Sequence, residues 1–66
     1  MNRYSIVRGR NQADDICYGI ALQGSPEIML RDLFRREEPA DRLLRLLNNN
    51  DVSPVHFGDI VDDFLP

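Results

Sequence analysis

Three side chains near the carboxyl end of this 66-residue chain have the types and spacing to do chemistry: His56, Asp59 and Asp63. Spacings of three and four residues place them on one face of a helix. An imidazole with two carboxylates can bind a divalent metal ion or act as a general acid and base. A single helix rarely supplies a complete set of ligands, and the sequence shows no second metal-binding element. A solvated helix face is therefore the favoured interpretation, and a metal- or small-ligand-binding protein is the alternative.

Three arginines, Arg31, Arg35 and Arg36, flank Phe34, and basic residues beside an aromatic ring can contact nucleic acid. Three acidic neighbours dilute that charge, and the formal net charge of the chain is −3. An acidic chain is poorly suited to a phosphate backbone. Weak nucleic-acid binding through these arginines is therefore the third hypothesis.

Two further carboxylates, Asp62 and Asp63, fall in the last turn of the same C-terminal helix, where the helix dipole disfavours negative charge. Exposed charges are tolerated there at little cost, which is the simpler interpretation. The competing hypothesis is that this acidic end docks on Arg31, Arg35 and Arg36 of a second copy. These five residues form the predicted interaction surface.

The rest of the sequence contains no recognisable catalytic motif. Cys17 is the single cysteine, so it forms no internal disulfide, and without a neighbouring His or Lys it is expected to be a small buried hydrophobe. The chain lacks a Gly-rich phosphate loop, a Ser-His-Asp set and a CxxC pair. Its size also predicts no room for a ligand pocket of several hundred Å³. We therefore expect neither enzymatic activity nor a cofactor.

The first half of the chain shows strand patterns. Residues 4–7 begin a strand, residues 9–15 form a polar hairpin loop, and residues 16–22 alternate between large and small side chains. A turn is predicted at residues 24–26, and residues 27–33 fit either a third strand, which we prefer, or a short helix.

The small side chains of the second strand, Cys17, Gly19 and Ala21, lie on the face opposite its large ones. That small face has room for a close neighbour, either a helix or another chain. Gly19 itself is expected to mark a bulge.

The second half shows two helical patterns. Pro39 suits the first position of a helix that ends in the run Asn48-Asn49-Asn50. Ser53 and Pro54 form an N-cap and first-turn pair for a second helix. Gly58 inside that helix suggests close packing.

The order of elements predicts an α+β fold: a small antiparallel meander of two to three strands, followed by a helical hairpin packed on one face. Residues 1–66 form a single domain. The predicted core consists of the following residues: Ile6, Tyr18, Ile20, Leu22, Ile28, Leu30, Leu43, Leu44, Leu47, Phe57, Ile60, Val61 and Phe64.

The strand residues Tyr18-Gly19-Ile20 and the C-terminal run from Asn50 to Leu65 resemble a family of short bacterial proteins of unknown function. The shared C-terminal pattern is Ser-Pro, a variable residue, His, an apolar residue and then an acidic-apolar alternation that ends in Asp-Phe-Leu. The family pattern implies a small hydroxyl or Asp cap before the first helix, where this chain has residues 34–38. The resemblance implies the same fold and a bacterial cytosolic origin, and it implies no activity.

A domain of this size gains only about 3–5 kcal/mol from its core, so a monomer with a complete core and a homo-oligomer both remain open. The lone thiol and the absence of a signal-peptide pattern favour the cytoplasm, and no apolar run could span a membrane. We expect a non-enzymatic protein-interaction or regulatory module whose partner is another protein or a second copy.

Overall fold

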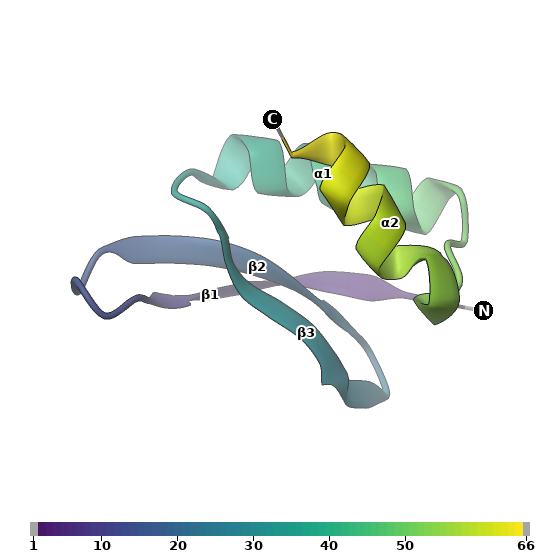
Figure 1. Ribbon diagram of the computed structural model, residues 1–66, viewed down its shortest axis with the longest axis horizontal. Coiled ribbons are helices and arrows are strands. Elements are labelled where there is room, and N and C mark those ends of the chain that lie inside the picture. The colour runs from purple at the N-terminus through teal and green to yellow at the C-terminus, as the bar shows by residue number, and fades with distance from the viewer. Residues whose placement is uncertain (1, 66) are drawn as a thin grey trace.

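The computed structural model describes residues 2–65, which fold as three strands followed by two helices. The elements in chain order are β1 (Tyr4–Arg10), β2 (Ile16–Leu22), β3 (Ser25–Phe34), α1 (Glu37–Asn49) and α2 (Pro54–Phe64). The strands form one antiparallel sheet in the order β1-β2-β3, and both helices lie over the same face of it (Figure 1). The predicted α+β fold is confirmed, and residues 27–33 belong to a strand rather than a helix. No helix within residues 2–65 has the length and apolar character needed to cross a membrane.

Strands β1 and β2 pair in an unbroken ladder from Tyr4 opposite Leu22 to Arg10 opposite Ile16. The predicted loop began at Gly9, but the ladder continues through Gly9 and Arg10, and the turn covers only the residues between the strands. The side-chain oxygen of Asn11 accepts hydrogen bonds from the backbone N–H groups of Ala13 (2.9 Å) and Asp15 (3.1 Å), which closes the turn locally.

The backbone of β3 approaches its neighbour β2 closely at Gly19, and we call this close approach the crossing of β3. An ideal Cβ on Gly19 would overlap the carbonyl oxygen of Leu30 and lie 2.6 Å from the carbonyl oxygen of Arg31. The pairing between β2 and β3 shifts register between Tyr18 and Ile20, so the pairing is irregular at Gly19, but the extra residues belong to β3 rather than to the predicted strand. The close neighbour expected on the small face is therefore the backbone of β3.

The β2–β3 turn is tighter than predicted. Leu22 pairs with Ser25, so the strand resumes inside the predicted turn at residues 24–26. Gly24 has a φ of +84°, a conformation that glycine adopts without steric cost.

Helix α1 begins earlier than predicted, at Glu37, so Pro39 is its third residue and not its first. The prediction was wrong because every N–H group of the first turn lacks an intrahelical partner, so proline fits any of these positions. Arg36 occupies the N-cap without a side-chain hydrogen bond, where the family pattern implied a Ser, Thr or Asp. The carboxylates of Glu37 and Glu38 instead stabilise the positive end of the helix.

Helix α2 begins as predicted. Ser53 is the N-cap, its hydroxyl accepts from the N–H of Val55 at 3.4 Å, and Pro54 is the first helical residue. The expectation for Gly58 was wrong: a Cβ built there meets nothing within 4 Å.

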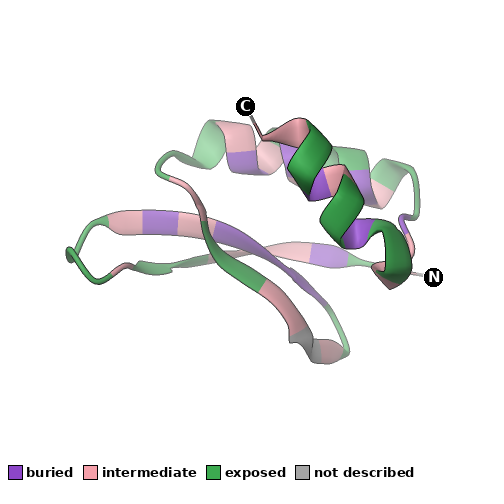
Figure 2. Ribbon diagram, in the orientation of Figure 1, coloured by how far each residue is buried: buried purple, intermediate pink, exposed green. Residues whose placement is uncertain are grey.

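The core lies between the sheet and the two helices (Figure 2). Its buried cluster consists of Tyr4, Ile20, Leu22, Leu43, Leu47, Val52, Phe57 and Val61. Of the remaining predicted residues, five pack partly buried against that cluster: Ile6, Ile28, Leu44, Ile60 and Phe64.

Two predicted core residues do not belong to this cluster. Leu30 is 38% exposed on the edge strand β3, although it pairs with the buried Ile20. Tyr18 is half-buried opposite Arg8, in the half of the sheet where a charged side chain replaces an apolar partner. Tyr4 and Val52, which are absent from the predicted core, are buried in the observed one.

Candidate interaction surfaces

The three residues singled out as metal ligands or acid–base groups, His56, Asp59 and Asp63, are all exposed on α2. Among residues 2–65, no three His, Cys, Asp or Glu side chains lie close enough together to hold a metal ion. The structure therefore leaves these residues on a solvated helix face without a further ligand.

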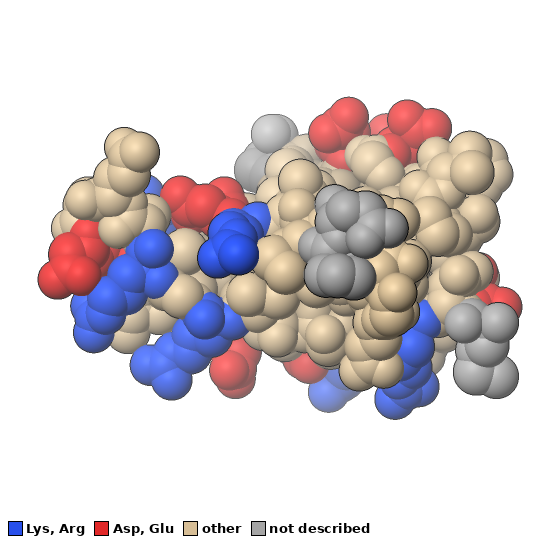
Figure 3. Space-filling view, turned by 90° about the horizontal axis from the view of Figure 1, so that it is seen from below, with Lys and Arg blue, Asp and Glu red and all other residues tan. Residues whose placement is uncertain are grey.

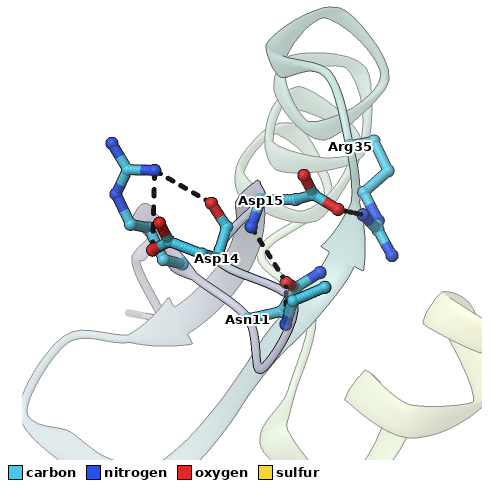
Figure 4. A network of polar contacts seen from close by, with 6 residues as sticks. Asn11, Asp14, Asp15 and Arg35 are labelled. Carbon is cyan, nitrogen blue, oxygen red and sulfur yellow. Dashed lines mark hydrogen bonds and ion pairs between the residues drawn. The ribbon is translucent and has the colours of Figure 1, made fainter.

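The predicted docking residues are dispersed over several elements. Arg31 is exposed on β3, Arg35 follows that strand and Arg36 caps α1. The guanidinium of Arg35 lies 3.1 Å from the Asp15 carboxylate, so it is already paired within the chain (Figure 4). Asp62 and Asp63 are exposed near the end of α2, and no ion pair within the described residues includes them.

A groove of about 540 Å³ lies beside the β1–β2 turn, which contradicts the expectation that the chain has no room for one. The lining residues are Arg10, Asn11, Gln12, Ala13, Cys17, Arg31 and Asp32. Cys17 is only 3% exposed, as expected for a small hydrophobe. Arg10 Nη1 donates to the carbonyl oxygen of Asp14 at 2.9 Å, so this guanidinium helps to hold the turn. The groove thus combines charged walls with one buried thiol.

Basic side chains gather at the end of the molecule that carries this turn, with acidic side chains among them (Figure 3). The two ion pairs there, between Arg10 and Asp14 and between Arg35 and Asp15, join side chains that are each more than half exposed. Exposed pairs of this kind contribute about 0–1 kcal/mol each, because water and salt screen them. This end of the molecule is therefore charged but only weakly held together by its charges.

The opposite end of β1 is fixed by Tyr4. The phenol of Tyr4 donates to the carbonyl oxygen of Val52 at 2.7 Å, and its ring stacks on Phe57 with centroids 5.2 Å apart. Burial raises the pKa of the Tyr4 phenol above its ordinary value of 10.0, and the carboxylate of Asp51 raises it further. One residue thus links the sheet, α2 and the loop between the helices.

The backbone of Tyr4 is bound by the side-chain amide of Asn48, from the last turn of α1. Tyr4 N–H donates to Asn48 Oδ1 at 2.8 Å, and Asn48 Nδ2 donates to the Tyr4 carbonyl oxygen at 3.2 Å. The amide therefore occupies the hydrogen-bonding positions that a neighbouring strand would take. At Tyr4 the outer edge of the sheet is closed.

The direction of the remaining β1 backbone groups follows from this contact. In an antiparallel ladder, alternate residues point both of their hydrogen-bonding groups at the partner strand, and the residues between them point both groups away. Tyr4 points away from β2, whereas Asn11 N–H donates to the carbonyl oxygen of Asp15 across the hairpin at 3.0 Å. The backbone N–H and C=O groups of even-numbered β1 residues therefore point away from the sheet, and those of odd-numbered residues point at β2.

The outward residues beyond Tyr4 are Ile6, Arg8 and Arg10. Strand β1 pairs with β2 alone, and within residues 2–65 no contact fills their outward N–H and C=O groups. The residues from Arg8 to Arg10 are also exposed. We define the outer edge of β1 as the backbone of Ile6, Arg8 and Arg10, which is free to pair with another strand.

Sequence reasoning identified the charges at this end of the molecule but neither the outer edge nor the groove. The sequence pattern indicates Asn48 only as part of a helix end, and it does not indicate that Arg10 and Cys17 line one groove. The regular alternation of residues 16–22 was the available signal, because a regular strand beside a hairpin loop implies a regular partner. It did not show which residues of that partner face outward.

Comparisons with known proteins give one match. Residues 2–66 match the model described as "Family of unknown function (DUF6514)". No curated protein matches the chain. No solved structure matches it either.

Proposed function

Because the chain belongs to DUF6514, a family of unknown function, its family supplies no activity, and we propose that it is a small non-enzymatic protein-interaction module. The outer edge of β1 carries this proposal. An edge strand with free backbone groups is a template for pairing with another chain, and strand addition is a recurring mode of peptide recognition.

The remaining polar chemistry of the fold is internally satisfied, which supports this choice. Among the side chains that the structure describes, every buried nitrogen and oxygen has a hydrogen-bond partner. A buried polar group aimed into a cleft would have pointed to substrate chemistry. The free groups lie instead on a strand edge, where a protein partner can reach them.

The setting we propose is the bacterial cytoplasm. The resemblance of the C-terminal motif to short bacterial proteins supports the source, and the unpaired Cys17 thiol supports a reducing compartment.

The test uses two substitutions at one outward position, Arg8. Both Arg8→Pro and Arg8→Ala remove the guanidinium, but only proline removes the outward N–H. That N–H takes no part in the β1–β2 ladder, so both variants should fold. In pull-downs with the tagged chain from the source cell, a true edge partner is retained by Arg8→Ala more strongly than by Arg8→Pro. A partner retained equally by both, or no stoichiometric partner at all, would refute the proposal.

Self-association through the predicted docking residues is a second arrangement. The exposed carboxylates of Asp62 and Asp63, which form no ion pair with the described side chains, favour it, as does the exposed Arg36. Sedimentation equilibrium should then show a dimer that dissociates at high salt and in the doubly substituted D62N/D63N chain. A mass that is the same under all these conditions excludes this arrangement.

A further inference from the structure

We infer that the outer edge of β1 binds an extended acidic segment of another protein, which joins the sheet as a fourth strand. This inference rests on the proposed function and specifies its partner. Three observations carry it: the length of the free edge, the charges beside it and the arginines that a second copy would bring to it.

The free edge has a defined start. Asn48 occupies the hydrogen-bonding positions at Tyr4, so an added strand can pair only with Ile6, Arg8 and Arg10. This stretch of five residues spans about 16 Å at the rise of a β-strand. An incoming segment therefore needs only about five extended residues, which a flexible region of a partner can supply.

The charges along this edge are positive. Strand β1 contains Arg8 and Arg10 and no acidic residue. Arg10 lies 3.7 Å from the Asp14 carboxylate, whereas Arg8 forms no ion pair with any side chain that the structure describes. Side chains opposite each other on neighbouring strands lie about 5 Å apart on the same face, where opposite charges attract. An acidic side chain opposite Arg8 would meet this condition, and one opposite Arg10 would share the Arg10 guanidinium with Asp14.

On the opposite face of β1, the added strand should present an apolar residue. The half-buried Val7 lies between two outward residues, and its side chain is on the other face of the strand. The strand that fits therefore alternates acidic and apolar side chains.

A second copy of this chain fits the same edge poorly. Antiparallel pairing of two β1 strands must avoid Tyr4, which Asn48 already covers. Every register that leaves Tyr4 clear sets Arg8 or Arg10 opposite an arginine of the second copy, and like charges directly opposite destabilise a strand pair. The register that sets Arg8 opposite Ile6 avoids an arginine pair, but it places Arg10 of one copy opposite Tyr4 of the other, which Asn48 already covers. The edge therefore selects a partner of opposite charge.

The test follows backbone amides of the full chain by NMR hydrogen exchange with synthetic peptides. The probe is a short capped peptide in which Glu and Val alternate. One control peptide replaces Glu with Lys, and another carries a central proline. We expect the Glu-Val peptide to slow exchange of the Ile6, Arg8 and Arg10 amides by about tenfold or more, because strand addition makes them hydrogen-bonded. The odd-numbered amides, already bonded to β2, should change little.

A charge-reversal variant separates charge from backbone geometry. In the chain carrying Arg8→Glu, the Glu-Val peptide should lose its effect and the Lys-Val peptide should gain one. The inference is overturned if Glu-Val leaves the three outward amides unchanged, if Lys-Val protects the parent chain equally, or if protection appears elsewhere. A cellular partner that distinguishes Arg8→Ala from Arg8→Pro but brings a neutral or basic segment would overturn this inference and leave the proposed function standing.

Discussion

The two edge strands of this sheet flank the same central strand but differ in regularity. Strand β1 pairs with β2 residue by residue over its whole length, whereas β3 pairs with two register shifts and crosses β2 closely at Gly19. Bulges and irregular pairing protect a sheet edge, because they interrupt the row of evenly spaced hydrogen-bonding groups that another strand would need.

This difference is the reason why we propose the edge of β1, and not that of β3, as a docking site. On β3 the extra residues at each register shift interrupt the outward row of groups. On β1 the outward groups alternate without interruption from Tyr4 to Arg10, and Asn48 closes only the first position. The regular edge is thus available over a short, defined stretch.

The largest effect on the free energy of unfolding is expected from Gly19→Ala, which adds a methyl group at the crossing of β3. A methyl group there would overlap the backbone of β3, and backbone cannot yield as a flexible side chain can. We expect a loss of about 3 kcal/mol or more, comparable to the whole stability of a domain this small. Urea unfolding followed by circular dichroism measures it.

The matched control is Gly58→Ala in the exposed part of α2. A Cβ meets nothing within 4 Å there, and alanine favours the helix by about 1 kcal/mol relative to glycine. The control should match or exceed the parent in stability. If Gly19→Ala unfolds at the same urea concentration as the parent, the close crossing described here is wrong.

The fold was predictable because its signals are local. The alternation of residues 16–22, the Ser53-Pro54 helix start and the apolar stripes of the helices each depend on neighbours within a few residues. The crossing of β3 was only half predictable: the small face of β2 indicated a close neighbour, but the register shifts that bring Leu30 and Arg31 there depend on long-range packing.

A smaller effect is expected from Asn48→Ala, which opens the closed position of the β1 edge. The substitution leaves the partly buried N–H and C=O groups of Tyr4 without their partners. We expect a loss of about 1–3 kcal/mol in the free energy of unfolding. Asn49→Ala, one residue further along the helix and exposed, is the control and should change stability little. Equal effects of the two substitutions would show that the amide contact contributes nothing specific.

The candidate surface was less predictable than the fold. Sequence alone identified Arg31, Arg35 and Arg36 as basic, but it could not show that Arg35 is paired with Asp15. It also could not give the phase of β1, because the contact that reveals it joins Tyr4 to Asn48, 44 residues away. Long-range contacts of this kind leave no periodic signal in the sequence.

A loss of stability in alkali is expected from Tyr4. Its pKa is raised in the folded chain, mainly by burial and further by Asp51, so folded molecules keep the proton at a pH where unfolded molecules lose it. The associated stability is fully present below pH 10.0 and falls as the pH rises from there through the folded-state pKa. The chain contains no lysine, and its arginines stay protonated, which simplifies the measurement.

Tyr4→Phe removes this titration and the hydrogen bond to Val52, so it should cost about 1–2 kcal/mol at neutral pH and weaken the alkaline decline. Asp51→Asn keeps a side chain that tolerates the positive φ of residue 51 and should reduce the decline partially. Urea midpoints measured from neutral pH to about pH 11, a range that includes the ordinary tyrosine pKa, test both variants. An alkaline slope that is identical in the parent and Tyr4→Phe would contradict the assignment to Tyr4.

The smallest effect is expected from the ion pair that joins the β1–β2 turn to the end of β3. Arg35 and Asp15 lie 3.1 Å apart, but both side chains are about 60% exposed. A double-mutant cycle with Arg35→Ala and Asp15→Ala should give a coupling of about 0.2–1 kcal/mol that disappears at high salt. A salt-resistant coupling well above this range would mean that the two edge strands are rigidly joined at the turn. The regular edge of β1 and the irregular edge of β3 would then respond to a partner as one unit, and the amides of β3 should report strand addition as well.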